Sequence, residues 1–445
     1  MKRFLLYILL VAVTLLPACK KVLDTQSELY IDQSLSIVDK RSAQAALTGA
    51  YNALSQNTYQ GNTFRYITNL LSDNIKWVGN TPTNREFDVY GVFATNSRVQ
   101  ELWTAIYKTV NIANNIIDKV PAINDVTFDQ TQRNTERGEA FFLRALSYFD
   151  LVRLWGNVPI VTQATRTASD NKDITNSTGA EVYQVIENDL DSAEVLLPAT
   201  INRNRANQYT ARALKARLYL YQQNWKAAED YATQVINDSV DFKLTKPYSQ
   251  FYAAKNSTES IFEVDYTINN KNSYASNWFQ NPTTGGKKEL LPTDDLVALL
   301  KDPNTGGSRS ALIFTVGGVT YGNMNFKIAT GEDQSYVLRL AELYLIRAEA
   351  RAEQLKLDDG LKDLNVIRNR ATVPAIAAVS TKDELIDKIF LERRVELAYE
   401  CHRWFDLIRK GKAQQVLGIT DANKLLLPIP KQEVLIANLT QNKGY

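Results

Sequence analysis

Apolar residues recur at helical spacing along several long stretches of the chain. Residues 42–54, 102–120 and 179–198 each carry apolar side chains three or four positions apart. In residues 102–120 the positions that share a face are Leu102, Ile106, Val110, Ala113 and Ile117. This spacing predicts amphipathic helices, each of which buries one stripe against a neighbour.

Residues 136–159 form the most apolar of these segments and show two adjacent stripes. One stripe comprises Phe141, Ala145, Tyr148, Val152 and Trp155, and the other Phe142, Leu146 and Phe149. A helix that is apolar on two stripes must pack against more than one neighbour. Gly156 and Pro159 are expected to end it.

Two further segments read as pairs of helices joined by tight turns. Residues 210–236 alternate alanines with large aromatics around a break at Gln223-Asn224, and residues 335–371 do the same around Asp358-Asp359-Gly360. Small residues packed against large ones in short paired helices are typical of tetratricopeptide repeats. The sequence therefore predicts a predominantly all-α fold built from tetratricopeptide-like helix pairs.

The remaining segments are rich in turn residues. Residues 55–97 and 240–330 contain many Gly, Asn and Thr, and only residues 260–266 alternate like a half-buried strand. We expect irregular structure with short β-hairpins there. The helical scaffold would then span about 41–54, 102–237 and 335–445, within a single domain of residues 41–445.

The first residues resemble an export signal. Lys2 and Arg3 precede thirteen uncharged residues, Phe4 to Leu16, which are too few to span a bilayer. Leu16-Pro17-Ala18-Cys19 resembles the lipobox of bacterial lipoproteins. This predicts a signal peptide at 1–18, a lipidated Cys19 and a tether at 19–40; the alternative is an ordinary secretory signal with a coincidental cysteine.

Composition excludes several classes of function. Basic and acidic residues number 51 and 49, so the chain lacks the excess of positive charge that nucleic-acid binding requires. Its one histidine, His402, excludes any site that needs two imidazoles. No phosphate loop, nucleophile elbow or cysteine metal cluster is present in the sequence. We therefore predict no catalytic residues, no metal and no cofactor.

Residues 383–412 read as a last helix with a high density of charge. Glu392, Glu396 and Glu400 share one face, and such carboxylates could act in glycoside hydrolysis. The favoured interpretation is an ion-pair network, because arginines follow within three or four residues. Cys401 and His402 do not suit a nucleophile–base pair, because adjacent residues on a helix point about 100° apart. Cys401 is expected to be a small buried residue.

The loop-rich regions offer a different chemistry. Trp77 lies near Asn74 and Arg85 in the first region, whereas Tyr274, Trp278 and Phe279 occupy the second. Sugars stack on aromatic rings and form hydrogen bonds with amide and guanidinium groups, so these six residues are candidate glycan ligands. The alternative for each aromatic is that it pins a long loop onto the helices.

Five segments, in order, resemble the SusD/RagB family of Bacteroidetes lipoproteins. They are the "CKKVLD" start with "AALTGAYNAL", "RALSYFDLVRLWGNVPIV", "YVLRLAELYLIRAEA", "LERRVELAYECHRWFDLIR" and "LLPIPKQEVLIANLTQNKGY".

The resemblance implies a lipoprotein of the outer membrane that faces the cell exterior and has four tetratricopeptide-like helix pairs. It also implies binding of oligosaccharide, or sometimes peptide, and a partnership with a SusC-like TonB-dependent barrel transporter. We therefore expect a non-enzymatic glycan-binding protein. The alternatives are a helical scaffold for protein interactions or an anchored glycosidase.

Overall fold

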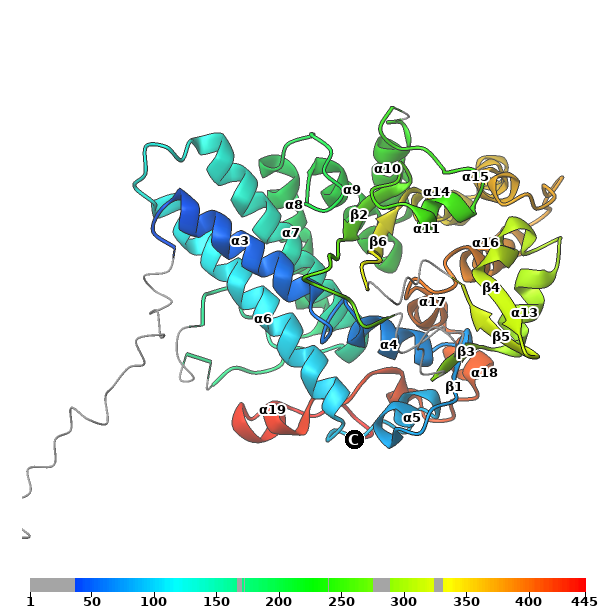
Figure 1. Ribbon diagram of the computed structural model, residues 1–445, viewed down its shortest axis with the longest axis horizontal. Helices are drawn as coiled ribbons and strands as arrows, with labels where there is room; N and C mark the ends of the chain where they lie inside the picture. The colour runs from blue at the N-terminus through cyan, green and yellow to red at the C-terminus, as the bar shows by residue number, and fades with distance from the viewer. Residues whose placement is uncertain (1–36, 166–169, 172, 239, 275–288, 324–330) are drawn as a thin grey trace, which may run out of the picture.

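The computed structural model describes residues 37–165, 170–171, 173–238, 240–274, 289–323 and 331–445. Helices dominate this part of the chain (Figure 1), which confirms the predicted fold class. The longer helices are α3 (Lys40–Ser55), α6 (Ser97–Lys119), α7 (Gln130–Trp155), α8 (Gly179–Leu196), α9 (Gln208–Tyr221), α10 (Trp225–Ile236), α14 (Leu340–Glu353), α15 (Leu357–Arg370) and α16 (Lys382–Glu396). The shorter ones are α4 (Thr63–Leu70), α5 (Pro82–Asp88), α11 (Ser249–Ala253), α13 (Asp294–Lys301), α17 (Arg403–Arg409), α18 (Ala413–Leu417) and α19 (Lys431–Ile436), with 3-10 turns η2 (Val120–Ala122), η4 (Gly307–Leu312) and η5 (Ala422–Leu425).

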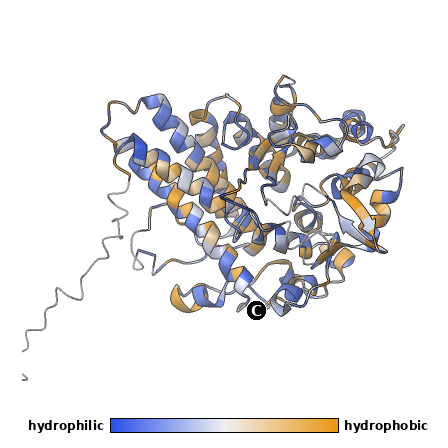
Figure 2. Cartoon of the chain, in the orientation of Figure 1, coloured by the Kyte–Doolittle hydropathy of each residue, from blue (hydrophilic) through white to orange (hydrophobic). Residues whose placement is uncertain are grey.

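The long helices pack in the order in which they occur along the chain. α6 packs on α7, α7 on α8, α8 on α9 and α9 on α10, and α10 then packs on α14, which also contacts α15 and α16. Polar and apolar residues alternate around α3, α6 and α7 (Figure 2). This is the arrangement of helix pairs that the periodicity predicts.

The ends of these helices follow from local sequence signals. Thr178 and Glu181 form a reciprocal capping box at the start of α8. Gly156 follows the last residue of α7 with a φ of +72°, a conformation that glycine adopts without strain. The predicted break at Gln223-Asn224 is confirmed, because Gln223 has a φ of +57° and the Asn224 side chain caps α10.

α7 is the central helix of the scaffold, as its two apolar stripes predict. Every residue from Phe142 to Trp155 is buried, whereas Phe141 is half-buried. Trp155 contacts Trp103 of α6 edge-on, with 5.2 Å between ring centroids, and its indole N–H donates to the carbonyl of Pro428 at 2.9 Å. The helix therefore joins its helical neighbours to the C-terminal segment.

The strands form three two-stranded antiparallel pairs in the described residues. They are β1 (Ile75–Trp77) with β3 (Leu290–Pro292), β2 (Ser260–Val264) with β6 (Ser335–Arg339), and β4 (Ile313–Val316) with β5 (Val319–Gly322). β4 and β5 confirm the expectation of a short hairpin in the second loop-rich region. β2 corrects one prediction: all five of its residues are buried, because α3 and α9 pack on it as well as β6.

Two helical predictions are wrong in detail. Residues 335–339 form strand β6 rather than the start of a helix. The turn between α14 and α15 falls at residues 354–356, and Gly360 lies inside α15. A Cβ on Gly360 would come within 2.9 Å of the Ala348 carbonyl oxygen, so its small size serves the close approach of α15 to α14 rather than a turn.

The first loop-rich region is also more ordered than predicted. Residues 63–70 form helix α4, and all eight of its residues are buried. Phe64, Ile67 and Leu70 share one side of this helix at helical spacing, and Arg65, Thr68 and Asn69 lie between them, so its sequence is amphipathic although all eight residues are buried.

The last predicted helix, 383–412, is broken. α16 ends at Glu396 and α17 begins at Arg403, with Cys401 between them at a φ of +66°. Cys401 and His402 therefore do not lie on one helix, contrary to the prediction.

None of the helices in the described part of the chain combines the length and the hydropathy needed to cross a membrane. The predicted signal peptide, Cys19 and most of the tether lie outside the described residues.

Candidate functional site

A surface groove of about 430 Å³ lies where the two loop-rich regions meet. Its lining combines apolar side chains, hydroxyls, an amide and a carboxylate, a mixture typical of sites for small polar ligands. The lining residues are Val78, Gly79, Asn80, Thr81, Glu289, Leu291, Val319 and Tyr321.

The pairing of β1 with β3 creates this groove. Trp77 is opposite Leu290 in the antiparallel register, and the backbone N–H of Val78 continues the ladder by donating to the Glu289 carbonyl at 2.8 Å. Segments separated by more than 200 residues thus become neighbours. The sequence carries aromatic clusters in both regions, but nothing in it indicates that the two regions meet.

The structure fixes the indole of Trp77 beside the groove. The Tyr66 ring contacts the indole edge-on, with 6.2 Å between ring centroids. The backbone N–H of Trp77 donates to Oδ1 of Asp88 at 3.0 Å. A Cβ on Gly79 would lie 2.3 Å from the indole atoms Cζ2 and Cη2. The ring therefore lies directly on the loop that lines the groove, and only glycine at position 79 leaves room for it.

The β4–β5 hairpin forms the opposite wall. Gly317 and Gly318 both have positive φ, as a two-residue turn of this kind requires. Phe314 stacks on Tyr321 with 5.3 Å between centroids, and Tyr321 is buried except where it lines the groove. This wall is therefore preorganised by packing within the hairpin.

Asn74 and Tyr274 lie beneath the surface rather than on it. Asn74 is fully buried; its amide nitrogen donates to the Ala398 carbonyl at 3.0 Å and its oxygen accepts from Arg394 at 3.0 Å. Tyr274 is also fully buried, with the Arg65 guanidinium 3.6 Å from its ring centroid. Both side chains already contact protein groups. For Tyr274 these contacts agree with the alternative that an aromatic residue pins a long loop onto the helices.

Of the other predicted ligands, Arg85 is exposed on α5, the helix that begins directly after the groove residues 78–81. Trp278 and Phe279 lie outside the described residues, in the segment that ends immediately before Glu289 of the groove. Sequence analysis does not name Asn80, Thr81, Glu289 or Tyr321. Asn80 and Thr81 lie three and four residues after Trp77, so the sequence alone could have suggested them as ligands. No nearby residue pattern marks Glu289 or Tyr321 as part of a binding site.

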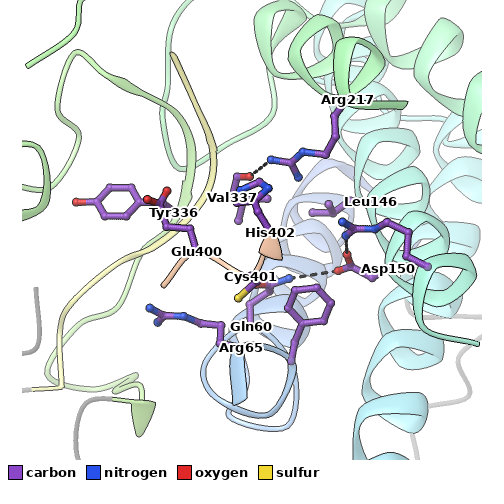
Figure 3. A pocket seen from close by; sticks show the side chains of 12 residues that line it. Gln60, Arg65, Leu146, Asp150, Arg217, Tyr336, Val337, Glu400, Cys401 and His402 are labelled. Atoms are coloured by element: carbon purple, nitrogen blue, oxygen red, sulfur yellow. Dashed lines mark hydrogen bonds and ion pairs between the residues drawn. The ribbon is translucent and has the colours of Figure 1, made fainter. Parts of the chain in front are cut away.

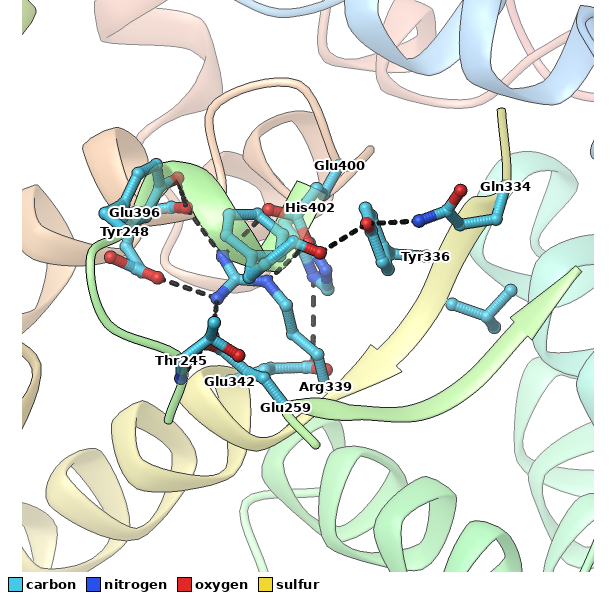
Figure 4. A network of polar contacts seen from close by, with 12 residues as sticks. Thr245, Tyr248, Glu259, Gln334, Tyr336, Arg339, Glu342, Glu396, Glu400 and His402 are labelled. Carbon is cyan, nitrogen blue, oxygen red and sulfur yellow. Dashed lines mark hydrogen bonds and ion pairs between the residues drawn. The ribbon is translucent and has the colours of Figure 1, made fainter. Parts of the chain in front are cut away.

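The clustered carboxylates of α16 belong to a buried ion-pair network (Figure 4). Arg339 pairs with Glu259, Glu396 and Glu400, each at 2.7 Å. Arg309 pairs with Glu392 at 2.7 Å and with Glu396 at 3.1 Å.

Arg370 and Arg368 complete this network. Arg370 pairs with Glu259 and Glu396, and Arg368 with Glu392. The ion-pair interpretation is confirmed, although the partners lie on other elements rather than one turn away. Glu259, Glu396 and Glu400 accept hydrogen bonds on both oxygens, and Glu392 is ion-paired with Arg309 and Arg368. Carboxylates held this way are poorly suited to general acid–base catalysis.

The described residues contain no group of three or more His, Cys, Asp or Glu side chains placed to hold a metal ion.

Two family profiles match separate segments, which together make up more than half of the chain. The profile for the family described as starch-binding and associating with the outer membrane (SusD-like) matches residues 22–220, and the profile of the SusD family matches residues 312–424. The chain belongs to the SusD family.

Relatives and solved structures agree with this assignment. A SusD-like protein of Formosa agariphila is 25% identical, with 94% of each chain covered. The starch-binding protein SusD of Bacteroides thetaiotaomicron is 26% identical over 71% of this chain and 75% of its own. Among solved structures, a laminarin-binding SusD-like protein has a TM-score of 0.80 and 25% identity, covering 92% of this chain and 100% of its own.

A second feature of this SusD-family chain lies deep inside it. A small cavity of about 30 Å³ is lined by Asp150, Arg153, Cys401, His402 and neighbouring residues (Figure 3). This volume holds a few water molecules at most and excludes a sugar. Burial lowers the pKa of His402 to about 3 and raises that of the Cys401 thiol to about 11, so both groups are neutral at physiological pH.

Proposed function

We propose that this SusD-family protein binds oligosaccharide at the outer surface of the cell and passes it to a TonB-dependent barrel transporter. The observation that carries the proposal is the groove between β1, β3 and the β4–β5 hairpin. Its volume of about 430 Å³ falls in the range of small-ligand sites, which is about 300–1,000 Å³.

The groove offers both contacts that a sugar needs. Val78, Leu291 and Val319 provide apolar surface for the C–H faces of the rings. Asn80 and Thr81 are exposed and offer an amide and a hydroxyl for the sugar hydroxyls. Because the site is open, its contacts are few and its affinity is expected to be modest.

Four of the six residues named from the sequence remain proposed ligand contacts. Trp77 borders the groove, Arg85 lies on the helix that begins directly after Thr81, and Trp278 and Phe279 lie outside the described residues. Asn74 and Tyr274 are proposed to support the two loop-rich regions from inside, since they have no free surface. The laminarin and starch named for the relatives make these two glycans the first to test.

Binding without catalysis is the second part of the proposal. Relatives carry names of binding proteins, and the carboxylates that a glycosidase would use are engaged with arginines in the network of Figure 4. Incubation of the purified protein with laminarin or starch is expected to release no reducing sugar. Steady release of sugar would favour the glycosidase alternative.

Affinity electrophoresis in gels containing laminarin or starch tests the site. We expect retardation of the wild type, and about a fivefold loss of affinity for Trp77→Ala and for Asn80→Ala, since each loses contacts worth roughly 1 kcal/mol. Trp225→Ala is the matched control, because Trp225 is also half-buried but lies on α10 of the scaffold. Equal migration with and without glycan would favour the interaction-scaffold alternative.

The location and the transporter are tested separately. Cys19 is proposed to carry the lipid anchor, because two or more acyl chains hold a protein on a membrane where one chain does not. Labelled palmitate should be incorporated into the wild type and not into Cys19→Ser. A barrel protein should co-purify with the wild type from detergent-solubilised outer membranes, and its absence would contradict the proposed partnership.

A further inference from the structure

A second groove, of about 540 Å³, lies between helix α3 and strand β2. It shares no lining residue with the groove described above. Its walls come from the outer face of α3, from residues 204–205, from β2 and from the turn that follows β2. Figure 1 shows α3 alongside the scaffold helices, away from β1, β3 and the β4–β5 hairpin.

Gly49 forms part of the floor of this groove. It lies in the interior of α3, where glycine is less favourable than alanine. A Cβ at this position would meet no other described atom within 4 Å, apart from chain neighbours and the helix's own backbone. Packing therefore does not require glycine here, and a larger residue would project into the open space of the groove.

The apolar part of the groove is rigid. Phe262 is fully buried and contacts Phe142 edge-on, with 5.2 Å between centroids. The Tyr51 hydroxyl donates to Oε2 of Glu139 at 2.6 Å and accepts from the Ala206 N–H at 2.8 Å. These contacts fix the Tyr51 ring beside Phe262, so the apolar surface is present before any ligand arrives.

The charged groups of the groove are balanced by ion pairs. Arg205 pairs with Glu139 through Nε at 2.6 Å and through Nη2 at 3.2 Å, and Asp265 pairs with Lys255 at 2.7 Å. A net charge on the ligand would therefore gain little here. The Arg205 side chain is 34% exposed, and its Nη1 donates to no acceptor among the described residues, which leaves that group for a neutral oxygen.

Amides complete the polar lining. The Asn52 oxygen accepts from Gln56 at 3.0 Å, which leaves its amide N–H groups as donors. The Asn270 amide nitrogen donates to Ser55 at 2.9 Å, which leaves its oxygen as an acceptor. The lining thus offers both donors and acceptors beside the apolar surface.

From this geometry we infer that the groove between α3 and β2 is a second binding site, which takes a neutral, polyhydroxylated ligand of one to a few sugar residues. The C–H faces of the ligand would rest on Tyr51 and Gly49, and its hydroxyls would bond to Arg205, Asn52 and Asn270. Two grooves on one chain would allow a long glycan to be held at two points, which increases its residence time through effective concentration.

Gly49→Leu tests the site without disturbing the fold, because the new side chain enters open space in a helix that tolerates leucine well. Gln44→Leu is the matched control, since Gln44 is an exposed residue of the same helix and does not line the groove. Thermal unfolding of both variants should occur at or above the wild-type temperature.

The probes are maltohexaose and laminarihexaose, titrated onto the full mature chain by calorimetry, with hydrogen exchange read on residues 45–55 and 262–270. We expect at least one probe to protect these residues in the wild type and in Gln44→Leu. In Gly49→Leu that protection should be lost and the affinity of this site should fall at least tenfold.

The variant Trp77→Ala tests whether the two grooves bind ligand independently, and so distinguishes a failure of this inference from a failure of the proposed function. It should weaken binding at the first groove and leave the protection of residues 45–55 intact. The inference is overturned if Gly49→Leu binds both probes as the wild type does, if neither probe protects these residues, or if only a capped, uncharged tetrapeptide does so.

Discussion

Glu396→Gln is the most informative single perturbation of the buried network. The Glu396 carboxylate accepts from Arg309 at 3.1 Å, from Arg339 at 2.7 Å and from Arg370, and none of these side chains is more than 1% exposed. Glutamine keeps the shape and one oxygen but removes the negative charge. Against the effect of burial, the three guanidinium groups hold the pKa of Glu396 below its usual value, so the carboxylate is ionised in the folded protein.

The expected magnitude follows from the charge balance. Arg309, Arg339, Arg368 and Arg370 face Glu259, Glu392, Glu396 and Glu400, so the network is neutral and the variant leaves one buried positive charge uncompensated. Breaking a buried pair by removing one partner costs about 3–5 kcal/mol. With an unfolding entropy of about 2.1 cal/mol/K per residue over roughly 400 residues, a loss of about 4 kcal/mol lowers the Tm by about 5 °C.

Differential scanning calorimetry and urea unfolding measure this loss. Asp387→Asn is the control, because Asp387 pairs with Lys412 at 2.7 Å but is 67% exposed, and an exposed pair contributes about 1 kcal/mol at most. The reasoning is refuted if Glu396→Gln loses no more stability than Asp387→Asn. Glycan binding by the folded variant should be unchanged, since the network does not line either groove.

Three further predictions concern other parts of the chain. Burial and the Glu139 carboxylate raise the pKa of Glu136 to about 7, so its ionisation destabilises the fold increasingly from about pH 4.5 to 7 and by a constant amount above. Glu136→Gln should therefore gain on the order of 1 kcal/mol over the wild type at pH 8 and nothing at pH 4 in urea unfolding; an equal effect at both pH values would contradict this. Gly360→Ala should cost about 1–3 kcal/mol, because its Cβ would lie 2.9 Å from a backbone oxygen of α14; Gly91→Ala, whose nearest contact is an ordinary 3.6 Å, is the control and should lose much less. In a chain that lacks Cys19, the Cys401 thiol should react with Ellman's reagent at pH 8 at least tenfold more slowly than in urea, because burial raises its pKa to about 11; equal rates would show that the thiol is accessible.

The scaffold was largely predictable because its signals are local. The two stripes of 136–159 became the buried faces of α7, and the break at Gln223-Asn224 became the turn before α10. Periodicity reports which side of a helix is buried, and capping residues report where it ends. In α4 the capping signal is missing, because the Asn62 side chain makes no cap hydrogen bond, and eight residues are too few to show a long periodic pattern.

For the charged segment 383–412, the sequence predicted that ion pairs form but not which residues form them. An excess of paired charges on 383–412 indicated ion pairs, and the structure contains them. Their partners were not predictable, because Arg309 and Arg339 lie 87 and 57 residues from Glu396. The break between α16 and α17 also escaped prediction, since a helical pattern of charges continues through Cys401 despite its positive φ.

For the candidate site, too, the sequence determined some features and the tertiary structure decided the others. The sequence by itself determined a helical scaffold, the presence of two loop-rich regions with aromatic, amide and hydroxyl residues, and the resemblance to the SusD family. Only the tertiary structure decided that β1 and β3 pair, that Asn74 and Tyr274 turn inward, and that Glu289 and Tyr321 share a groove with Asn80. The physical reason is that helical patterns arise from contacts three or four residues apart, whereas a binding groove forms where distant segments meet, and which segments meet depends on the packing of the whole chain.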